Sequence, residues 1–154
     1  MKARQGLSSL ISEQPLSSSP AGGRVSADPE IIPNFPGVCL ESFKTLCAES
    51  PGDFDALTQA CRSHLAAFER MSAESEEVID DEARALCELN VRLIAAFRNG
   101  TDAERRLVWA TARYFVESED ADGDFGIGGL DDDIAVANAV AGYLGHEDWK
   151  LTLR

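Results

Sequence analysis

The chain has 154 residues, of which 44% are hydrophobic and 27% charged, a composition that fits one globular domain and excludes global disorder. The formal net charge is −13, but residues 1–27 carry +2 because they hold three basic residues and one acidic residue, Lys2, Arg4, Arg24 and Glu13. Residues 28–154 therefore carry −15. A domain this acidic repels phosphate backbones, so we expect no nucleic-acid binding and favour a partner protein with a basic surface, or a cation.

The cysteines and the apolar segments predict where the protein resides. Cys39, Cys47, Cys61 and Cys87 show no CxxC spacing, and the N-terminus lacks the apolar run of a secretory signal. We therefore expect reduced thiols in a cytoplasmic protein. The longest apolar segments, such as residues 134–144, are far shorter than the roughly 20 residues of a membrane helix, so no membrane association is expected.

Residues 1–37 are rich in Ser, Pro and Gly, and their prolines interrupt any helical or strand periodicity. We predict a flexible, disordered tail here, followed by an acidic helical domain of residues 38–154. A brief basic and apolar pattern near the start is the alternative, because it is also typical of a targeting peptide or a docking helix. That pattern consists of Lys2, Arg4, Leu7, Leu10 and Ile11.

Helical periodicity begins at Val38. Residues 38–49 place several apolar side chains on one face, which predicts a first helix. Ser50 and Pro51 predict the N-cap and first turn of a second helix that runs to about Met71. Residues 75–98 carry a wide apolar stripe, which predicts a third helix.

Two further helices are apolar on nearly every side. The capping-box pattern of Thr101 and Glu104 opens a helix over residues 102–116, and a helix over residues 132–144 ends at Gly145. Helices of this kind lie in the interior of a bundle, and no stretch shows sustained strand alternation. We predict an all-α fold, a compact bundle of about five helices with residues 102–116 and 132–144 as its central buried hairpin.

The stretch between these two helices is dense in carboxylates and has no basic residue. Carboxylates at this density coordinate a hard cation, stabilise a helix N-terminus, or present a negative surface to a partner. The eight carboxylates are Glu117, Glu119, Asp120, Asp122, Asp124, Asp131, Asp132 and Asp133.

Read as a calcium loop, the twelve residues 120–131 place Asp120, Asp122 and Asp124 at the first, third and fifth positions. Two departures weaken the match, since Phe125 replaces the sixth-position glycine and Asp131 replaces the bidentate glutamate at the twelfth. We keep a weak Ca²⁺ or Mg²⁺ site at these four aspartates as an alternative, and expect no other cofactor. Without a cation, Asp131 and its two successors cap the following helix.

The same region resembles the signature of the YkvA-like domain, a bacterial family of small helical proteins of unknown function. In that family an aromatic-rich helix leads to an Asp, a Pro-Asp pair, a Gly, and an Asp-Asp pair that opens another helix. The matching positions are Tyr114-Phe115, Asp120, Asp124-Phe125, Gly129-Leu130-Asp131-Asp132 and Val136. Ser118 and Gly123 stand in place of the prolines. The resemblance covers about residues 107–144 and implies a helical hairpin with no established metal role.

No known catalytic motif is present, neither a P-loop nor GxSxG nor HExxH. Cys61 and His64 share a helical face, and with Cys87 they suggest either a zinc site or ordinary core residues, of which we favour the core. We therefore expect a non-enzymatic protein that acts by protein–protein interaction, as an accessory, inhibitor or immunity-type factor. The predicted interaction surface consists of Glu117, Glu119, Asp132 and Asp133. The alternative is a divalent-cation module.

Overall fold

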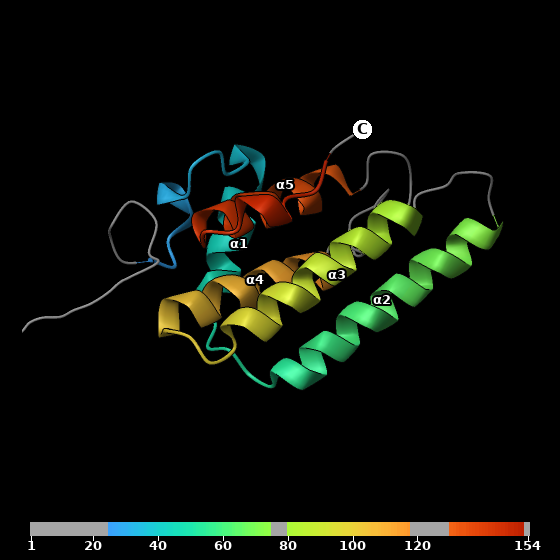
Figure 1. The fold of residues 1–154 in the computed structure, drawn as a ribbon, viewed down its shortest axis with the longest axis horizontal. Coiled ribbons are helices and arrows are strands. Elements are labelled where there is room, and N and C mark those ends of the chain that lie inside the picture. Colours follow the sequence, from blue (N-terminus) through green and yellow to red (C-terminus); the bar gives the residue numbers. More distant parts are fainter. Residues whose placement is uncertain (1–24, 75–79, 118–129, 153–154) are drawn as a thin grey trace, which may run out of the picture.

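The computed structural model describes residues 25–74, 80–117 and 130–152. These residues form five α-helices and three short 3₁₀ helices, and none of them lies in a strand, so the predicted all-α fold is confirmed (Figure 1). The α-helices are α1 (Leu40–Cys47), α2 (Phe54–Glu74), α3 (Asp80–Phe97), α4 (Asp102–Glu117) and α5 (Asp131–Tyr143). The 3₁₀ helices are η3 (Pro29–Ile31), η4 (Gly37–Cys39) and η6 (Glu147–Trp149).

Helix α4 forms the centre of the bundle, since it contacts α1, α2, α3 and α5. Helices α2 and α3 lie side by side on one flank, while α5 and α1 lie on the other (Figure 1). Beyond Asp132, every residue of α5 is buried or half-buried. The predicted central pair of helices is therefore confirmed, because both are apolar on nearly every side and are covered by their neighbours.

Two predicted helix ends match the structure. The amide of Glu104 donates to Thr101 Oγ1 at 3.1 Å and the amide of Thr101 donates to Glu104 Oε1 at 2.9 Å, the reciprocal capping box that opens α4. At the end of α5, Gly145 adopts a φ of 94° that favours glycine. The amide of His146 then donates to the carbonyl of Ala141 at 2.8 Å, which closes the helix in a Schellman motif.

The predicted start of α2 is wrong. Asp53, rather than Ser50, caps the helix, because its Oδ1 accepts from the amides of Asp55 at 2.9 Å and Ala56 at 3.2 Å. Packing against Trp109 explains the shift. A Cβ on Gly52 would lie 3.2 Å from the Trp109 ring, and the Phe54 ring meets that ring edge-on at 5.4 Å. This contact holds Gly52 and Phe54 against α4, and the helix begins at Phe54.

The predicted flexible tail of residues 1–37 is wrong for residues 25–37. Pro29 and Ile32 are buried, and the Phe35 ring lies 4.9 Å from the Phe43 ring of α1. The prolines do not prevent this packing, since Pro29 occupies the first turn of η3, where its missing N–H costs nothing. Residues 1–24 lie outside the described part of the chain.

Long-range polar contacts fasten two peripheral segments. Arg106 of α4 donates through Nη1 to the carbonyls of Cys47, Ala48 and Glu49, at 3.2, 3.2 and 2.9 Å, which satisfies the end of α1. Asn138 of α5 holds the chain after η6, because its Nδ2 donates to the Leu151 carbonyl at 2.8 Å and its Oδ1 accepts from the Leu151 amide at 2.7 Å. Among the described helices, none combines the length and apolar character needed to cross a bilayer.

Candidate functional site

The described carboxylates of the acidic stretch lie where α4 ends and α5 begins. Glu117 is the last residue of α4, and Asp131, Asp132 and Asp133 form the first turn of α5. The remaining four, Glu119, Asp120, Asp122 and Asp124, lie outside the described residues. The cation site predicted at three of these aspartates therefore stays a prediction.

Three of the described carboxylates face solvent. Asp131 and Asp132 are exposed, and the Glu117 side chain is 47% exposed. We call these three residues the acidic end. Leu130 anchors the start of α5, and with it Asp131 and Asp132, because Leu130 is buried and its carbonyl accepts from the Ile134 amide at 2.9 Å. Asp131 and Asp132 are stabilised by the positive end of the α5 dipole.

Asp133 is not part of a surface. Its side chain is only 3% exposed, so the prediction that it belongs to the interaction surface is wrong. Helical periodicity explains this result, since Asp133 precedes the fully buried Val136 and Ala137 by three and four residues and shares their face of α5. Burial raises the pKa of the Tyr114 phenol, and the neighbouring Cys39 and the charges of Asp133 and Asp132 add to the effect.

A contact between Tyr114 and Cys39 ties three elements together at this end. The two side chains are hydrogen-bonded, and burial together with the charges of Asp132 and Asp133 raises the pKa of the Cys39 thiol. The start of α1, the last turn of α4 and the first turn of α5 therefore meet here. Val38, next to Cys39 in the chain, is 86% exposed.

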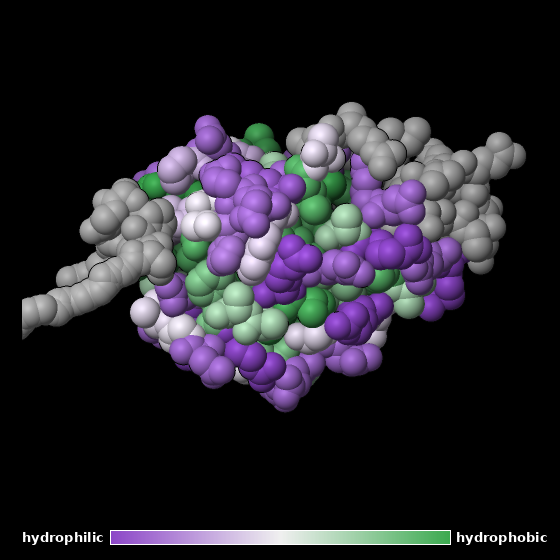
Figure 2. All heavy atoms as spheres, in the orientation of Figure 1, coloured by the Kyte–Doolittle hydropathy of each residue, from purple (hydrophilic) through white to green (hydrophobic). Residues whose placement is uncertain are grey.

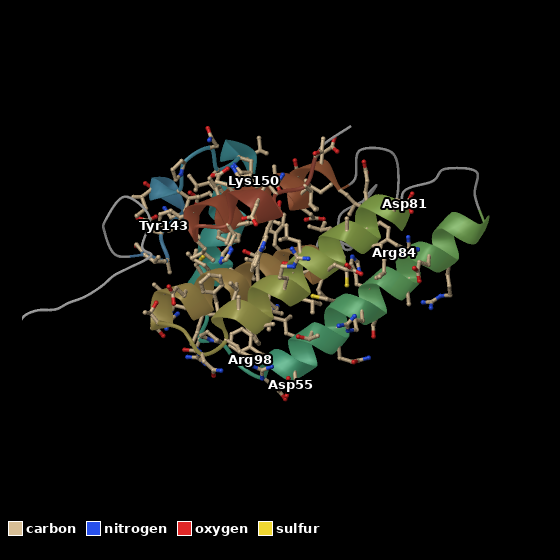
Figure 3. All side chains as sticks on the ribbon, in the orientation of Figure 1. Asp55, Asp81, Arg84, Arg98, Tyr143 and Lys150 are labelled. Carbon is tan, nitrogen blue, oxygen red and sulfur yellow. The ribbon has the colours of Figure 1, made fainter. Side chains whose placement is uncertain are left out.

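Basic side chains are largely occupied within the fold. Arg113 pairs with Glu49 at 2.6 Å and also with Glu117. Arg98 of α3 pairs with Asp55 of α2 at 2.8 Å, and its hydrogen bond holds the pKa of that carboxyl below the ordinary value (Figure 3). Further pairs are Lys44–Glu30, Arg84–Glu69, Arg84–Asp81, Arg106–Asp102 and Lys150–Glu147.

These exposed pairs add little stability each, but they occupy six of the described basic side chains, namely Lys44, Arg84, Arg98, Arg106, Arg113 and Lys150. Asp131 and Asp132, by contrast, form no ion pair with any residue that the structure describes. The excess negative charge is therefore left in part at the acidic end. Figure 2 shows the wider surface, on which hydrophilic residues dominate the visible face and apolar residues form smaller areas between them.

His64 and the cysteines lie in the core. His64 packs edge-on against the Phe68 and Phe115 rings at 5.0 and 4.7 Å, and all four cysteines are buried. Burial raises the pKa of Cys61 to about 12, so its thiol stays protonated and is a poor nucleophile. Within the described residues, no three His, Cys, Asp or Glu side chains come together in a way that could hold a metal ion.

Sequence reasoning missed three features of this site. The exposure of Val38 has a signal in the sequence, because Val38 lies off the apolar stripe of Leu40, Phe43 and Leu46. The burial of Asp133 also had a signal in the sequence, namely its three- and four-residue spacing to apolar positions. The contact of Cys39 with Tyr114 had none, because it joins elements far apart in the chain.

Comparisons with protein-family models, with curated proteins and with solved structures each found no match for this chain.

Proposed function

We propose that this protein acts by binding another protein through the acidic end, as an accessory, inhibitor or immunity-type factor, without a reaction of its own. The observation that carries the proposal is the exposure of Asp131 and Asp132, which form no ion pair with any residue that the structure describes. Exposed charge without an internal partner steers the approach of an oppositely charged protein and supplies specificity for it.

The chemistry of this surface defines the partner. Asp131 and Asp132, which form no ion pair with a described residue, favour a partner that carries lysine or arginine, and the strongly negative domain accelerates the approach of such a partner at low ionic strength. A nucleic acid is disfavoured by the same charge. We infer a protein with a basic patch that meets Asp131 and Asp132.

A relation to the YkvA-like domain is also proposed. Tyr114 and Phe115 lie in the last turns of α4, and Asp131 and Asp132 open α5, which is the helical arrangement that the resemblance implies. This placement supports the relation but adds nothing to the function, because fold-level likeness does not carry function.

Affinity capture from the native host tests the proposal. The full chain is immobilised, and captured proteins are quantified by mass spectrometry for the wild type and for Asp131→Asn with Asp132→Asn. We expect a captured protein that is lost in this double variant and also lost when the salt concentration is raised.

A matched variant separates a specific surface from net charge. Glu88→Gln with Asp148→Asn removes the same two charges from exposed positions away from the acidic end. This control should capture the partner as the wild type does. Equal loss in both double variants would mean that capture depends only on total charge, and capture of nothing at low salt would equally contradict the proposal.

A divalent-cation module remains the second candidate, because α4 and α5 contact each other and flank the acidic stretch as the helices of a calcium loop do. Calorimetric titration with Ca²⁺ and Mg²⁺ distinguishes the two candidates. Binding heat at millimolar concentration that disappears in Asp120→Asn with Asp124→Asn would establish the module. Absence of any heat removes it.

A further inference from the structure

A groove on the α5 side of the molecule is separate from the acidic end. It has a volume of about 200 Å³ and mainly apolar walls, formed by Ile31 and Pro33 on one side and by Ala139, Gly142 and Tyr143 of α5 on the other. Ile31 is 53% exposed, an unusual loss of burial for an apolar side chain next to a core. We call this feature the Tyr143 groove.

The position of the groove along α5 separates it from the acidic end. Tyr143 lies twelve residues after Asp131, which corresponds to about 18 Å along a helix. Lys150 and Glu147 form the charged border of the groove and pair with each other at 3.0 Å (Figure 3 labels Tyr143 and Lys150). A ligand of the groove therefore meets apolar side chains and a border that is already neutralised.

The chain itself enters the domain at this groove. The amide of Ser26 donates to the Tyr143 hydroxyl at 3.0 Å, and Val25 and Ala27 pack against the core. The segment of residues 1–24 is therefore tethered directly beside the groove. A tether of this kind gives a segment an effective local concentration in the millimolar range, so even weak complementarity produces occupancy.

The amino acids of this segment complement the groove and the domain. Leu7, Leu10 and Ile11 are spaced by three and four residues, so they share one face if the segment is helical. Residues 1–24 carry +2, whereas the rest of the chain carries −15. The segment thus brings apolar side chains for the groove and cations for the domain around it.

The connection is long enough for this contact. Residues 12–24 separate Ile11 from Val25 and are rich in Ser, Pro and Gly, which is typical of a linker. Fully extended, they span up to about 45 Å, which exceeds the roughly 30 Å diameter of a small domain. The linker therefore places no limit on reaching the groove.

We propose that the Tyr143 groove is the docking site for residues 1–11 of the same chain, with Leu10 and Ile11 as the anchors. Docking covers the exposed Ile31 and places Lys2 and Arg4 on an acidic domain. This inference concerns a different surface from the acidic end and stands independently of the proposed partner.

Paramagnetic broadening in the full chain tests the docking. A nitroxide is attached to Ser9→Cys, and the four native cysteines, being buried with raised pKa values, react slowly and are checked by labelling the wild type. We expect the amide signals of Asn34, Gly142 and Tyr143 to lose most of their intensity. Amides of α2 such as Leu57 should keep theirs.

Two variants and one mixed sample test whether residues 1–11 of the same chain occupy the groove. Leu10→Ser with Ile11→Ser, and separately Ile31→Ser, should each restore the broadened signals. Ile31 is exposed, so its replacement leaves the fold intact. Broadening that is absent, or that survives these variants, overturns the proposal. Broadening of isotope-labelled chains by nitroxide on unlabelled chains in a mixed sample also overturns it, because the occupant would then be a second copy.

Discussion

At the scale of single residues, the burial of cysteine thiols makes the free energy of unfolding depend on pH. Cys47 and Cys61 lie in the core, and burial raises the pKa of each thiol from its ordinary value of 9.0 to about 12, with Asp28 adding to the effect at Cys47. The unfolded chain releases these protons near pH 9, whereas the folded chain retains them. A raised pKa therefore stabilises the fold fully below about pH 9, and that contribution is lost as the pH rises toward 12.

We predict that the free energy of unfolding falls above about pH 9, by at most about 1.4 kcal/mol per pH unit for each thiol. Urea unfolding at about pH 8 and about pH 10.5 measures the fall in the wild type and in Cys47→Ala with Cys61→Ala. The double variant starts from a lower stability because of the cavities that it creates, but it should lose less between the two pH values. An equal loss in both proteins would rule out the thiols as the cause.

At the scale of helices, local signals predicted those ends that local chemistry determines. Thr101 with Glu104 and Gly145 with His146 form their caps within a few residues, and the sequence therefore located the start of α4 and the end of α5. The start of α2 depends instead on Trp109, more than fifty residues from Gly52, and no local pattern contains that contact. The packed segment 25–37 was missed for the same reason.

The same distinction between local and long-range contacts applies to the candidate site. The position of Asp131 and Asp132 in the first turn of a helix followed from sequence, since acidic residues favour that turn. The neighbourhood of Val38 and Cys39 did not follow, because it requires knowing that α1 crosses the last turn of α4. Chemistry within one helix was predictable, and chemistry between helices was not.

Asn138 provides a test at this scale, since it is the polar residue of α5 that joins the helix to the chain after η6. Asn138→Ala removes both hydrogen bonds to Leu151 and should lower the free energy of unfolding by about 1–3 kcal/mol. Hydrogen exchange at the Leu151 amide, followed by NMR, should become much faster. Asn99→Ala, at an exposed position after α3, is the control and should leave that exchange rate unchanged. Unchanged exchange in Asn138→Ala would contradict the role of this contact.

At the scale of the whole molecule, charge opposes compactness. The chain has a net charge of −13, and folding brings its carboxylates closer together than they are in the unfolded chain, so that they repel one another. The ion pairs that offset this repulsion are exposed. Repulsion is screened by salt over a Debye length of about 10 Å at 0.1 M. Stability should therefore respond to salt in a direction that the net charge determines.

We predict that the free energy of unfolding at neutral pH rises as NaCl increases from about 0.01 to about 0.15 M. Urea is the appropriate denaturant because guanidinium is itself a salt. Neutralising Glu88→Gln with Asp148→Asn should reduce the rise, since two like charges are removed. A fall in stability with salt would show that the ion pairs outweigh the repulsion.

The contact of Arg106 with the end of α1 implies an order of events during synthesis. Helix α1 has eight residues, fewer than the roughly 12–15 that an isolated helix needs, so it gains its stability from neighbours. The carbonyls at its end, from Cys47 to Glu49, accept hydrogen bonds from the Arg106 guanidinium, which lies 57 to 59 residues further along the chain. The ribosome must therefore release α4 before α1 becomes stable, and until then the apolar face of α1, with Phe43 at its centre, is open to solvent and to other chains.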